Sequence, residues 1–109
     1  SAASDVYKRQ EQKQLAAFAK AMAHPTRIAI LQYLASLDSC FFGDIHKELG
    51  ISKATVSEHL RLLKESGLIQ GEIIPPKVKY CINAENFRKA AGEFDRLLTV
   101  RNKCRGRCK

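Results

Sequence analysis

The chain has 109 residues and a mass of 12.2 kDa, enough for one small domain with a single hydrophobic core. Apolar residues make up 45% and charged residues 28%, an ordinary balance for a globular domain. No stretch approaches the roughly 18 consecutive apolar residues of a membrane span, and no basic-then-apolar leader opens the chain, so we expect a cytoplasmic protein. The absence of Trp and an aromatic content of 7% argue against a surface that stacks on sugars or bases.

The formal net charge of +8 is concentrated at the C-terminal end. Residues 11–87 carry nine basic and eight acidic side chains, whereas residues 88–109 carry eight basic and two acidic ones. The last nine residues, 101–109, form a basic tail that also holds Cys104 and Cys108. Such a run is more often a solvated tail than a specific contact surface, so net charge alone does not identify a DNA-binding protein.

Residues 1–10, SAASDVYKRQ, resemble a translated sequencing-library adaptor. We therefore expect a native chain that begins near Glu11; the alternative is a natural disordered N-terminus. Residues 11–100 are then the folded domain, and residues 101–109 are its tail.

Two helices are predicted before residue 40. The first covers residues 11–23, where apolar residues recur at helical spacing; these are Leu15, Phe18, Ala19 and Met22. His24-Pro25 ends it, because helix is disfavoured before a proline, while proline itself suits the first position of a helix. We expect His24 to cap or be buried at this entry. The second helix covers residues 26–37, and residues 40–42 form a short β segment.

Residues 43–67 predict two helices joined by a tight turn. A brief helix over residues 44–49 is followed by Gly50, which suits a left-handed turn, and by Ser52, a good N-cap for a helix beginning at Lys53. The outward face of this second helix carries hydroxyl, cationic and hydrogen-bonding groups, namely Lys53, Thr55, Ser57, His59 and Arg61. Such a mixture suits a DNA major groove, where short side chains contact bases and cations contact phosphates. An amphipathic hairpin with a solvated face fits this pattern equally well.

A β-hairpin is predicted next. Residues 68–74 and 77–82 form its strands around a Pro75-Pro76 turn, and the returning strand carries Lys77 and Lys79. Directly after a DNA-contacting helix, these lysines suit a wing that straddles a phosphate backbone. The alternative is that they are edge-strand lysines that deter aggregation.

Three segments resemble the ArsR/SmtB family of winged-helix repressors. They are HPTRIAILQYL, GDIHKELGISKATVSEHLRLLKESGLIQGE and KVKYCI, and the resemblance extends from about residue 15 to residue 100. The run from Ser52 to Leu63 is its strongest part. The resemblance implies a mainly α fold with a small β-wing, five helices plus a β-hairpin. It also implies a homodimer that binds double-stranded operator DNA and releases it when a metal, metalloid or other inducer binds.

The same resemblance places the dimer interface on the first and last helices. The last helix is predicted over residues 84–102, with Asn83 as its cap. The apolar stripes of the two helices hold more apolar surface than a chain of this size needs to hide, which agrees with a dimer. The residues expected at the interface are Leu15, Phe18, Met22, Phe87, Phe94 and Leu98.

The family's familiar ion sites are incomplete in this chain. Where relatives carry Cys-x-Cys pairs, one thiol remains at Cys40 and one at Cys81, and the last predicted helix contains no His of a zinc set. Pairing of the short segment before the helix-turn-helix with the returning wing strand would bring these two thiols together. With Cys104 and Cys108 they are candidate ligands for As(III), Sb(III) or Zn, or a redox pair, or else simply buried cysteines. We expect no structural disulfides, because a cytoplasmic DNA-binding domain is kept reduced.

No phosphate-binding loop, nucleophile elbow or paired carboxylates appear, so we expect no enzyme activity. We predict a sequence-specific DNA-binding transcriptional repressor that a thiophilic ion such as arsenite releases from its operator. The alternatives are a winged-helix regulator that responds to thiol oxidation and a protein-interaction module. The predicted DNA-contacting residues are Ser52, Lys53, Thr55, Ser57, His59, Arg61, Lys77 and Lys79. For His59 the alternative is that it packs inward.

Overall fold

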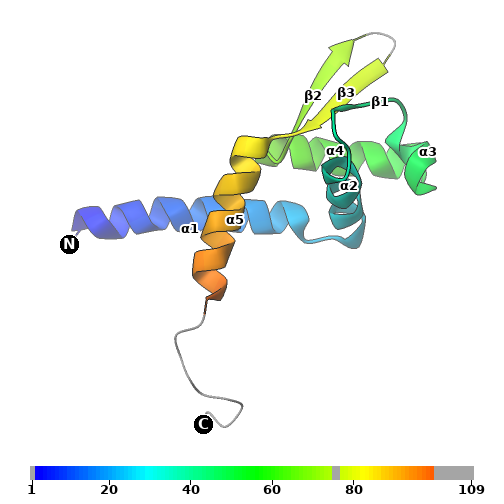
Figure 1. Ribbon diagram of the computed structural model, residues 1–109. Helices are drawn as coiled ribbons and strands as arrows, with labels where there is room; N and C mark the ends of the chain where they lie inside the picture. Colours follow the sequence, from blue (N-terminus) through cyan, green and yellow to red (C-terminus); the bar gives the residue numbers. More distant parts are fainter. Residues whose placement is uncertain (1, 75–76, 100–109) are drawn as a thin grey trace.

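The computed structural model describes residues 2–74 and 77–99, so the predicted basic tail with Cys104 and Cys108 lies outside the described residues (Figure 1). The described part contains five helices and a three-stranded antiparallel sheet. The elements are α1 (Ala2–Met22), α2 (Pro25–Ala35), β1 (Phe41–Phe42), α3 (Ile45–Leu49), α4 (Lys53–Ser66), β2 (Ile69–Ile74), β3 (Lys77–Ile82) and α5 (Ala84–Leu98). The predicted fold class, mainly α with a small β-wing, is confirmed. Among the described helices, none is long and apolar enough to span a bilayer.

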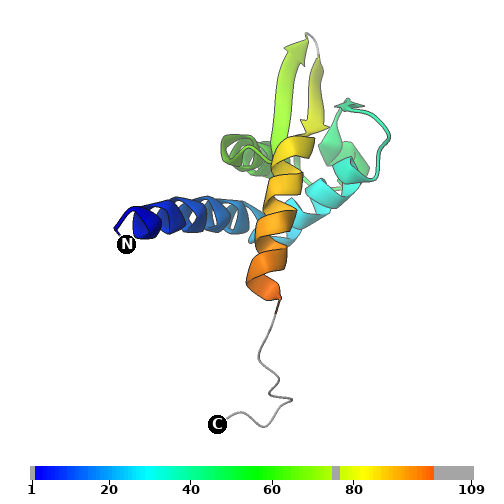
Figure 2. The same ribbon diagram turned by 60° about the vertical axis from the view of Figure 1, so that its left-hand side comes forward.

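The first helix is longer than predicted. α1 begins at Ala2, so the segment 1–10 that we set aside is helical from its second residue onward. This segment contains neither proline nor glycine, so nothing in its sequence ends the helix. Both views show the N-terminal part of α1 extending away from the rest of the chain (Figures 1 and 2). The later part of the helix carries Phe18 and Ala21 into the core.

The entry to α2 follows the prediction closely. His24 has extended backbone angles and its Nδ1 accepts a hydrogen bond from the backbone N–H of Thr26 at 3.0 Å. Pro25 occupies the first turn, where its missing N–H removes no helical hydrogen bond. The imidazole therefore caps α2, as the sequence indicated.

Two helices end earlier than predicted. α2 ends at Ala35, and α5 ends at Leu98 rather than at residue 102. A hydroxyl side chain follows each end: that of Ser36 donates to the carbonyl of Tyr33 at 2.6 Å, and that of Thr99 donates to the carbonyl of Asp95. Such local side-chain hydrogen bonds compete with continuation of the helix.

The sheet has the strand order β1-β3-β2, so β3 is its central strand. Across β3, Phe42 of β1 and Glu72 of β2 are both registered with Lys79. A lysine with a strand on each side has no free edge to protect. The edge-strand interpretation is therefore wrong for Lys79.

The hydrophobic core is packed against the inner sides of α4 and β2. The largest fully buried side chains are Ile30, Leu63, Leu68 and Ile69. At the end of α4, Gly67 adopts a φ of +84°, and its carbonyl accepts a hydrogen bond from Asn86 Nδ2 at 2.8 Å. A Cβ at Gly67 would approach that nitrogen to 2.8 Å, so glycine is required on both counts. This contact fixes α5 against the point where α4 turns into the wing.

Candidate nucleic-acid interface

A tight turn joins α3 to α4. Gly50 adopts the left-handed conformation with a φ of +67°, and the N–H of Ile51 donates back to the carbonyl of His46 at 3.1 Å. Ser52 then caps α4, because its Oγ accepts a hydrogen bond from the N–H of Thr55 at 3.3 Å. The same hydroxyl donates to Thr55 Oγ1 at 2.7 Å, which fixes two short polar groups at the start of the helix.

The two faces of α4 differ sharply. Its inner face is buried against the core through Val56, Leu60 and Leu63, at 3%, 6% and 0% exposure. The exposed side carries most of the predicted outward residues, namely Lys53, Thr55, Ser57 and Arg61. Burial of the apolar side fixes the direction in which the polar side points.

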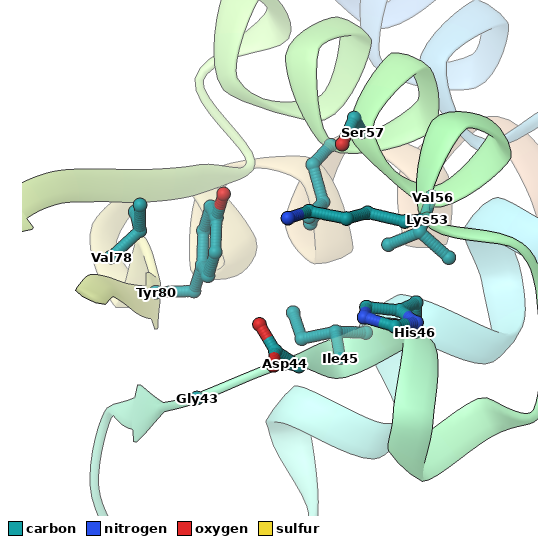
Figure 3. A pocket seen from close by; sticks show the side chains of 10 residues that line it. Gly43, Asp44, Ile45, His46, Lys53, Val56, Ser57, Val78 and Tyr80 are labelled. Carbon is teal, nitrogen blue, oxygen red and sulfur yellow. The ribbon is translucent and has the colours of Figure 1, made fainter. Parts of the chain in front are cut away.

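A hollow of about 400 Å³ separates the start of α4 from α3 and the wing. Figure 3 shows Lys53 extending from α4 across this hollow, with its ammonium group pointing toward the hydroxyl of Tyr80 on β3. Ser57 lines the same hollow from α4, and Asp44 and His46 line it from the α3 side. Burial raises the pKa of Tyr80, so its phenol is a neutral hydrogen-bond donor near neutral pH. Helix α4 and the wing thus meet at a surface of hydroxyl and cationic groups.

The wing lysines Lys77 and Lys79 lie at different positions along β3. Lys79 lies over the ring of Phe42, with 5.7 Å between its Nζ and the ring centroid, which is within cation–π range. Lys77 is the first residue of β3, at the outer end of the hairpin. The contact between Lys79 and Phe42 was not predicted, because the cross-strand register is not visible in the sequence.

His59 takes the inward position, the alternative to the DNA contact predicted for it, so it is a correction to the predicted DNA-contacting set. Its ring packs against that of His24, with 4.4 Å between centroids, and its Nδ1 is buried without a hydrogen-bond partner among the described residues. Burial lowers the pKa of His59, and the neighbouring His24 and Arg27 lower it further. The imidazole therefore belongs to the junction of α1, α2 and α4 rather than to the exposed face.

Arg61 is exposed, but its guanidinium is already hydrogen-bonded to two carboxylates of its own helix. Its guanidinium donates two hydrogen bonds to the carboxylate of Glu58 and one to that of Glu65. These hydrogen bonds raise the pKa of Arg61 and lower the pKa of Glu58. Neither carboxylate was predicted as a partner of Arg61, although their spacing of three and four residues from the arginine is typical of helix ion pairs.

The predicted proximity of Cys40 and Cys81 is confirmed. Because β1 pairs with β3, the two residues face each other at the base of the wing, with their Cα atoms 4.5 Å apart. They form a disulfide, so the expectation of no disulfide is wrong for this pair. Both residues are half-buried and line a hollow of about 440 Å³ bounded by the end of α2 and the start of α5.

A complete metal site is absent from the part of the chain that the structure describes. No group of three or more His, Cys, Asp or Glu side chains converges there. Reduced Cys40, just before β1, and Cys81 of β3 could supply two neighbouring thiolates, which suits a soft ion. Any third thiolate would come from Cys104 or Cys108, which lie outside the described residues.

The predicted dimer residues divide into three groups. Phe18 is a correction, because it is 2% exposed and belongs to the core of its own chain. Four others are half-buried, namely Leu15, Met22, Phe87 and Phe94. Leu98 is 70% exposed, and its neighbour Leu97, which the sequence analysis missed, is 62% exposed. Nearby, Glu93 is buried, and its Oε2 has no hydrogen-bond partner within the described residues.

Comparison with known sequences identifies the central segment. A helix-turn-helix domain family matches residues 22–72. The HTH-type transcriptional regulator CmtR of Mycobacterium tuberculosis is 35% identical over 81 residues, 73% of this chain and 67% of that protein. The HTH-type transcriptional regulator YgaV of Escherichia coli is 33% identical over 73 residues, 67% of this chain and 74% of that protein.

Comparison with solved structures gives the same result. Reduced HlyU from Vibrio cholerae matches with a TM-score of 0.66 and 24% identity over 86% of this chain and 98% of its own. An ArsR-like transcriptional regulator from Rhodococcus matches with a TM-score of 0.62 and 22% identity over 79% of this chain and 80% of its own. These two show the fold alone. The cadmium metal-sensor CmtR from Mycobacterium tuberculosis matches with a TM-score of 0.55 and 28% identity over 86% of this chain and 99% of its own.

Proposed function

Because this chain belongs to the ArsR/SmtB family of winged helix-turn-helix regulators, we propose that it is a homodimeric transcriptional repressor whose inducer acts on its thiols. The chain is a DNA-binding regulator and not an enzyme. Repression, dimerisation and the chemistry of induction are our proposals.

The polar face of α4 carries the proposal for DNA contact. Ser52, Lys53, Thr55 and Ser57 lie at the exposed N-terminal end of a helix whose other side is buried. Short hydroxyl groups of this kind contact base edges in a major groove, and the cations of α4 and the wing contact phosphates. Lys77 and Lys79 are the proposed wing contacts. His59 is left out of the proposed set because it packs on His24.

The exposed end of α5 supports a second copy as the partner. Leu97 and Leu98 form an uncovered apolar surface beside α1. The buried Glu93 oxygen without a partner adds to this, because an unsatisfied buried carboxylate oxygen is costly and a second chain could supply the donor. A two-fold dimer would place its two α4 helices about 34–36 Å apart, in successive major grooves.

A thiophilic ion such as arsenite is the first candidate inducer. A relative, CmtR, is a cadmium metal-sensor, which supports a soft ion as the class of ligand. In this chain the ion would bind the thiolates of reduced Cys40 and Cys81, with Cys104 or Cys108 as a third ligand. Ligation would fix the base of the wing and so change its position relative to α4.

Thiol oxidation is the second candidate, favoured by the disulfide itself. Disulfides of proteins that work beside DNA are more often redox-sensing than structural, because thiols there are otherwise kept reduced. Cys81 is adjacent to Tyr80 and two residues from Lys79, so closing the S–S bond links the wing surface directly to the segment before α3. An oxidant such as diamide takes up the two electrons and two protons that the thiols release.

A gel-shift with DNA from immediately upstream of the gene tests these proposals. The reduced protein should bind, and arsenite or diamide should release it. Single Ser substitutions then map the response: Cys40 and Cys81 are required for both inducers, whereas whichever of Cys104 and Cys108 is the third ligand is required for arsenite alone. If all four variants respond like the parent, the thiol proposal is wrong. If the reduced parent ignores its own promoter DNA, the repressor proposal is wrong.

A further inference from the structure

The guanidinium of Arg61 is held by its own helix. Its Nε donates to Glu58 Oε2 at 3.1 Å and its Nη2 donates to Glu58 Oε1, while its Nη1 donates to Glu65 Oε1 at 2.7 Å. All three side chains are more than half exposed, at 53%, 58% and 61%. Exposed ion pairs of this kind contribute little to folding stability, so stability does not account for the arrangement.

Arg61 keeps two of its N–H donors free of the two carboxylates. A guanidinium has five N–H groups, and the two carboxylates use three of them. One N–H remains on each terminal nitrogen of Arg61. Two N–H groups on adjacent nitrogens match a bidentate acceptor, and in a major groove the commonest such acceptor is the O6/N7 edge of guanine.

The local charge argues against a phosphate as that acceptor. Glu58, Arg61 and Glu65 together carry one positive and two negative charges. A phosphate oxygen would be repelled by this cluster, whereas a guanine edge is uncharged. Lys53, at the other end of the same exposed side, forms no ion pair among the described residues and is the better phosphate contact.

The position of Arg61 fits a base contact. It lies four residues, one helical turn, after Ser57, on the same side of α4. Both residues line a hollow of about 380 Å³ that also reaches Tyr80 of the wing. The arginine therefore faces the space between the helix and the wing, next to the hydroxyl groups already assigned to base edges.

We propose that Arg61 selects a guanine in each half-site of the operator, and that Glu58 and Glu65 are positioning residues that hold its guanidinium group in place. This inference rests on the proposed DNA-binding function. It changes the role that the sequence assigned to Arg61 from a general cation to a specificity-determining residue.

The experiment measures binding to a panel of operator duplexes in which each base pair of the half-site is replaced in turn. For Arg61→Ala we expect the affinity for the parent site to fall about tenfold or more, since a bidentate contact discriminates by about 1–3 kcal/mol. Discrimination should vanish at one G·C pair per half-site and persist at every other position. The salt dependence should stay the same, because no phosphate contact is lost.

Lys53→Ala is the matched comparison on the same helix. It should weaken binding to all duplexes alike and reduce the slope of log affinity against log salt by about 0.9 per lost phosphate contact. If Arg61→Ala behaves in this second way, Arg61 contacts phosphate and the inference is overturned.

Glu58→Gln tests the positioning role. It should weaken discrimination at the same G·C pair as Arg61→Ala, by a smaller factor, even though it removes a negative charge near DNA. Glu72→Gln, an exposed carboxylate on β2, should leave discrimination unchanged. If Glu58→Gln only tightens binding to every duplex, Glu58 does not position Arg61. If the parent protein binds no duplex, the proposed function fails instead, so the two failures are distinguishable.

Discussion

Helices α4 and α5 are alike in length and in how they begin, but they differ in what they leave uncovered. They have 14 and 15 residues, and each starts at a side-chain cap, Ser52 and Asn83 respectively. The apolar side of α4 is buried in its own chain through Val56, Leu60 and Leu63, so its uncovered side is polar and carries charges of both signs. α5 keeps Leu97 and Leu98 exposed at its end. From this difference in exposed side chains we propose that α4 contacts DNA and that α5 contacts a second copy of the chain.

The two helices are also packed differently, which allows one chain to hold both proposed surfaces. α4 is packed on its inner side by α1, α2 and β2, which fixes the direction of its polar groups before DNA is present. α5 is buried at Ala90 and Glu93, in its middle, and contacts Gly67 through Asn86 near its start. Its last two residues, Leu97 and Leu98, are exposed and can be covered by a partner.

The largest expected effect compares the same substitution on the two helices. Leu63→Ala should lower the free energy of unfolding by about 2–5 kcal/mol, because Leu63 is fully buried and its truncation leaves a cavity. Leu98→Ala should change it by less than about 0.5 kcal/mol in dilute, monomeric protein, since that side chain is mostly exposed. Urea denaturation followed by circular dichroism measures both. Equal losses would show that the two leucines have the same environment and would contradict the difference between the two helices.

A charge-introducing variant tests the partner assigned to α5. Leu97→Glu combined with Leu98→Glu should leave the chain folded but monomeric in sedimentation, because two carboxylates would replace the apolar contact. Affinity for a two-half-site operator should then fall about 100-fold or more, since linked binding is lost. Phe42→Glu, at a half-exposed aromatic residue on β1, is the matched control and should remain dimeric. A dimeric double variant would exclude the end of α5 from the interface.

Removing the two caps separates stability from DNA binding. Ser52→Ala and Asn83→Ala should each cost about 1 kcal/mol in thermal or urea unfolding, because each side chain accepts a backbone N–H at its helix start. Only Ser52→Ala should also weaken DNA binding, since Ser52 and Thr55 begin the polar surface of α4. If Asn83→Ala weakened DNA binding equally, loss of helix order rather than loss of a contact would explain both.

The smallest expected effect concerns pH and the His59 junction under α4. The pKa of His59 is lowered in the folded chain, first by burial and then by His24 and Arg27. The unfolded chain therefore binds the proton more readily, and stability should fall as pH drops through about 6.5, the ordinary histidine value. His59→Gln should flatten this part of the unfolding-against-pH curve. His46→Gln, on α3, should leave it in place; if it flattens the curve equally, His59 is not the group responsible.

The order and type of the elements were predictable because hydrophobic periodicity and turn residues act locally. Gly50 and Ser52 located the turn and the start of α4, and His24 was expected at the entry to α2. The ends were harder to predict: α1 continues to Ala2, and α5 stops at Leu98. Helix ends depend on single competing hydrogen bonds, such as the one from Thr99, that periodicity does not reveal.

The orientation of a site residue was predictable where the spacing of apolar residues in one helix decides it. It was not predictable where contacts between distant segments decide it. The outward position of Lys53 and Ser57 followed from the spacing of the apolar residues in α4. The inward position of His59 depends on His24, which lies 35 residues away in sequence, and the burial of Phe18 depends on how α1 packs. Cys40 and Cys81 were correctly brought together by the expected strand pairing, but their oxidation to a disulfide was not foreseen.

DNA binding through the polar face of α4 is the central claim, and one titration tests it most directly. Fluorescence anisotropy would follow the parent and a Lys53→Ala, Ser57→Ala double variant on upstream DNA at increasing salt. The parent should bind as a dimer, with log affinity falling by about 0.9 per contacted phosphate for each unit of log salt. The double variant should lose most of this affinity while its dimerisation and unfolding stay unchanged. Undiminished binding by the folded double variant would contradict the account.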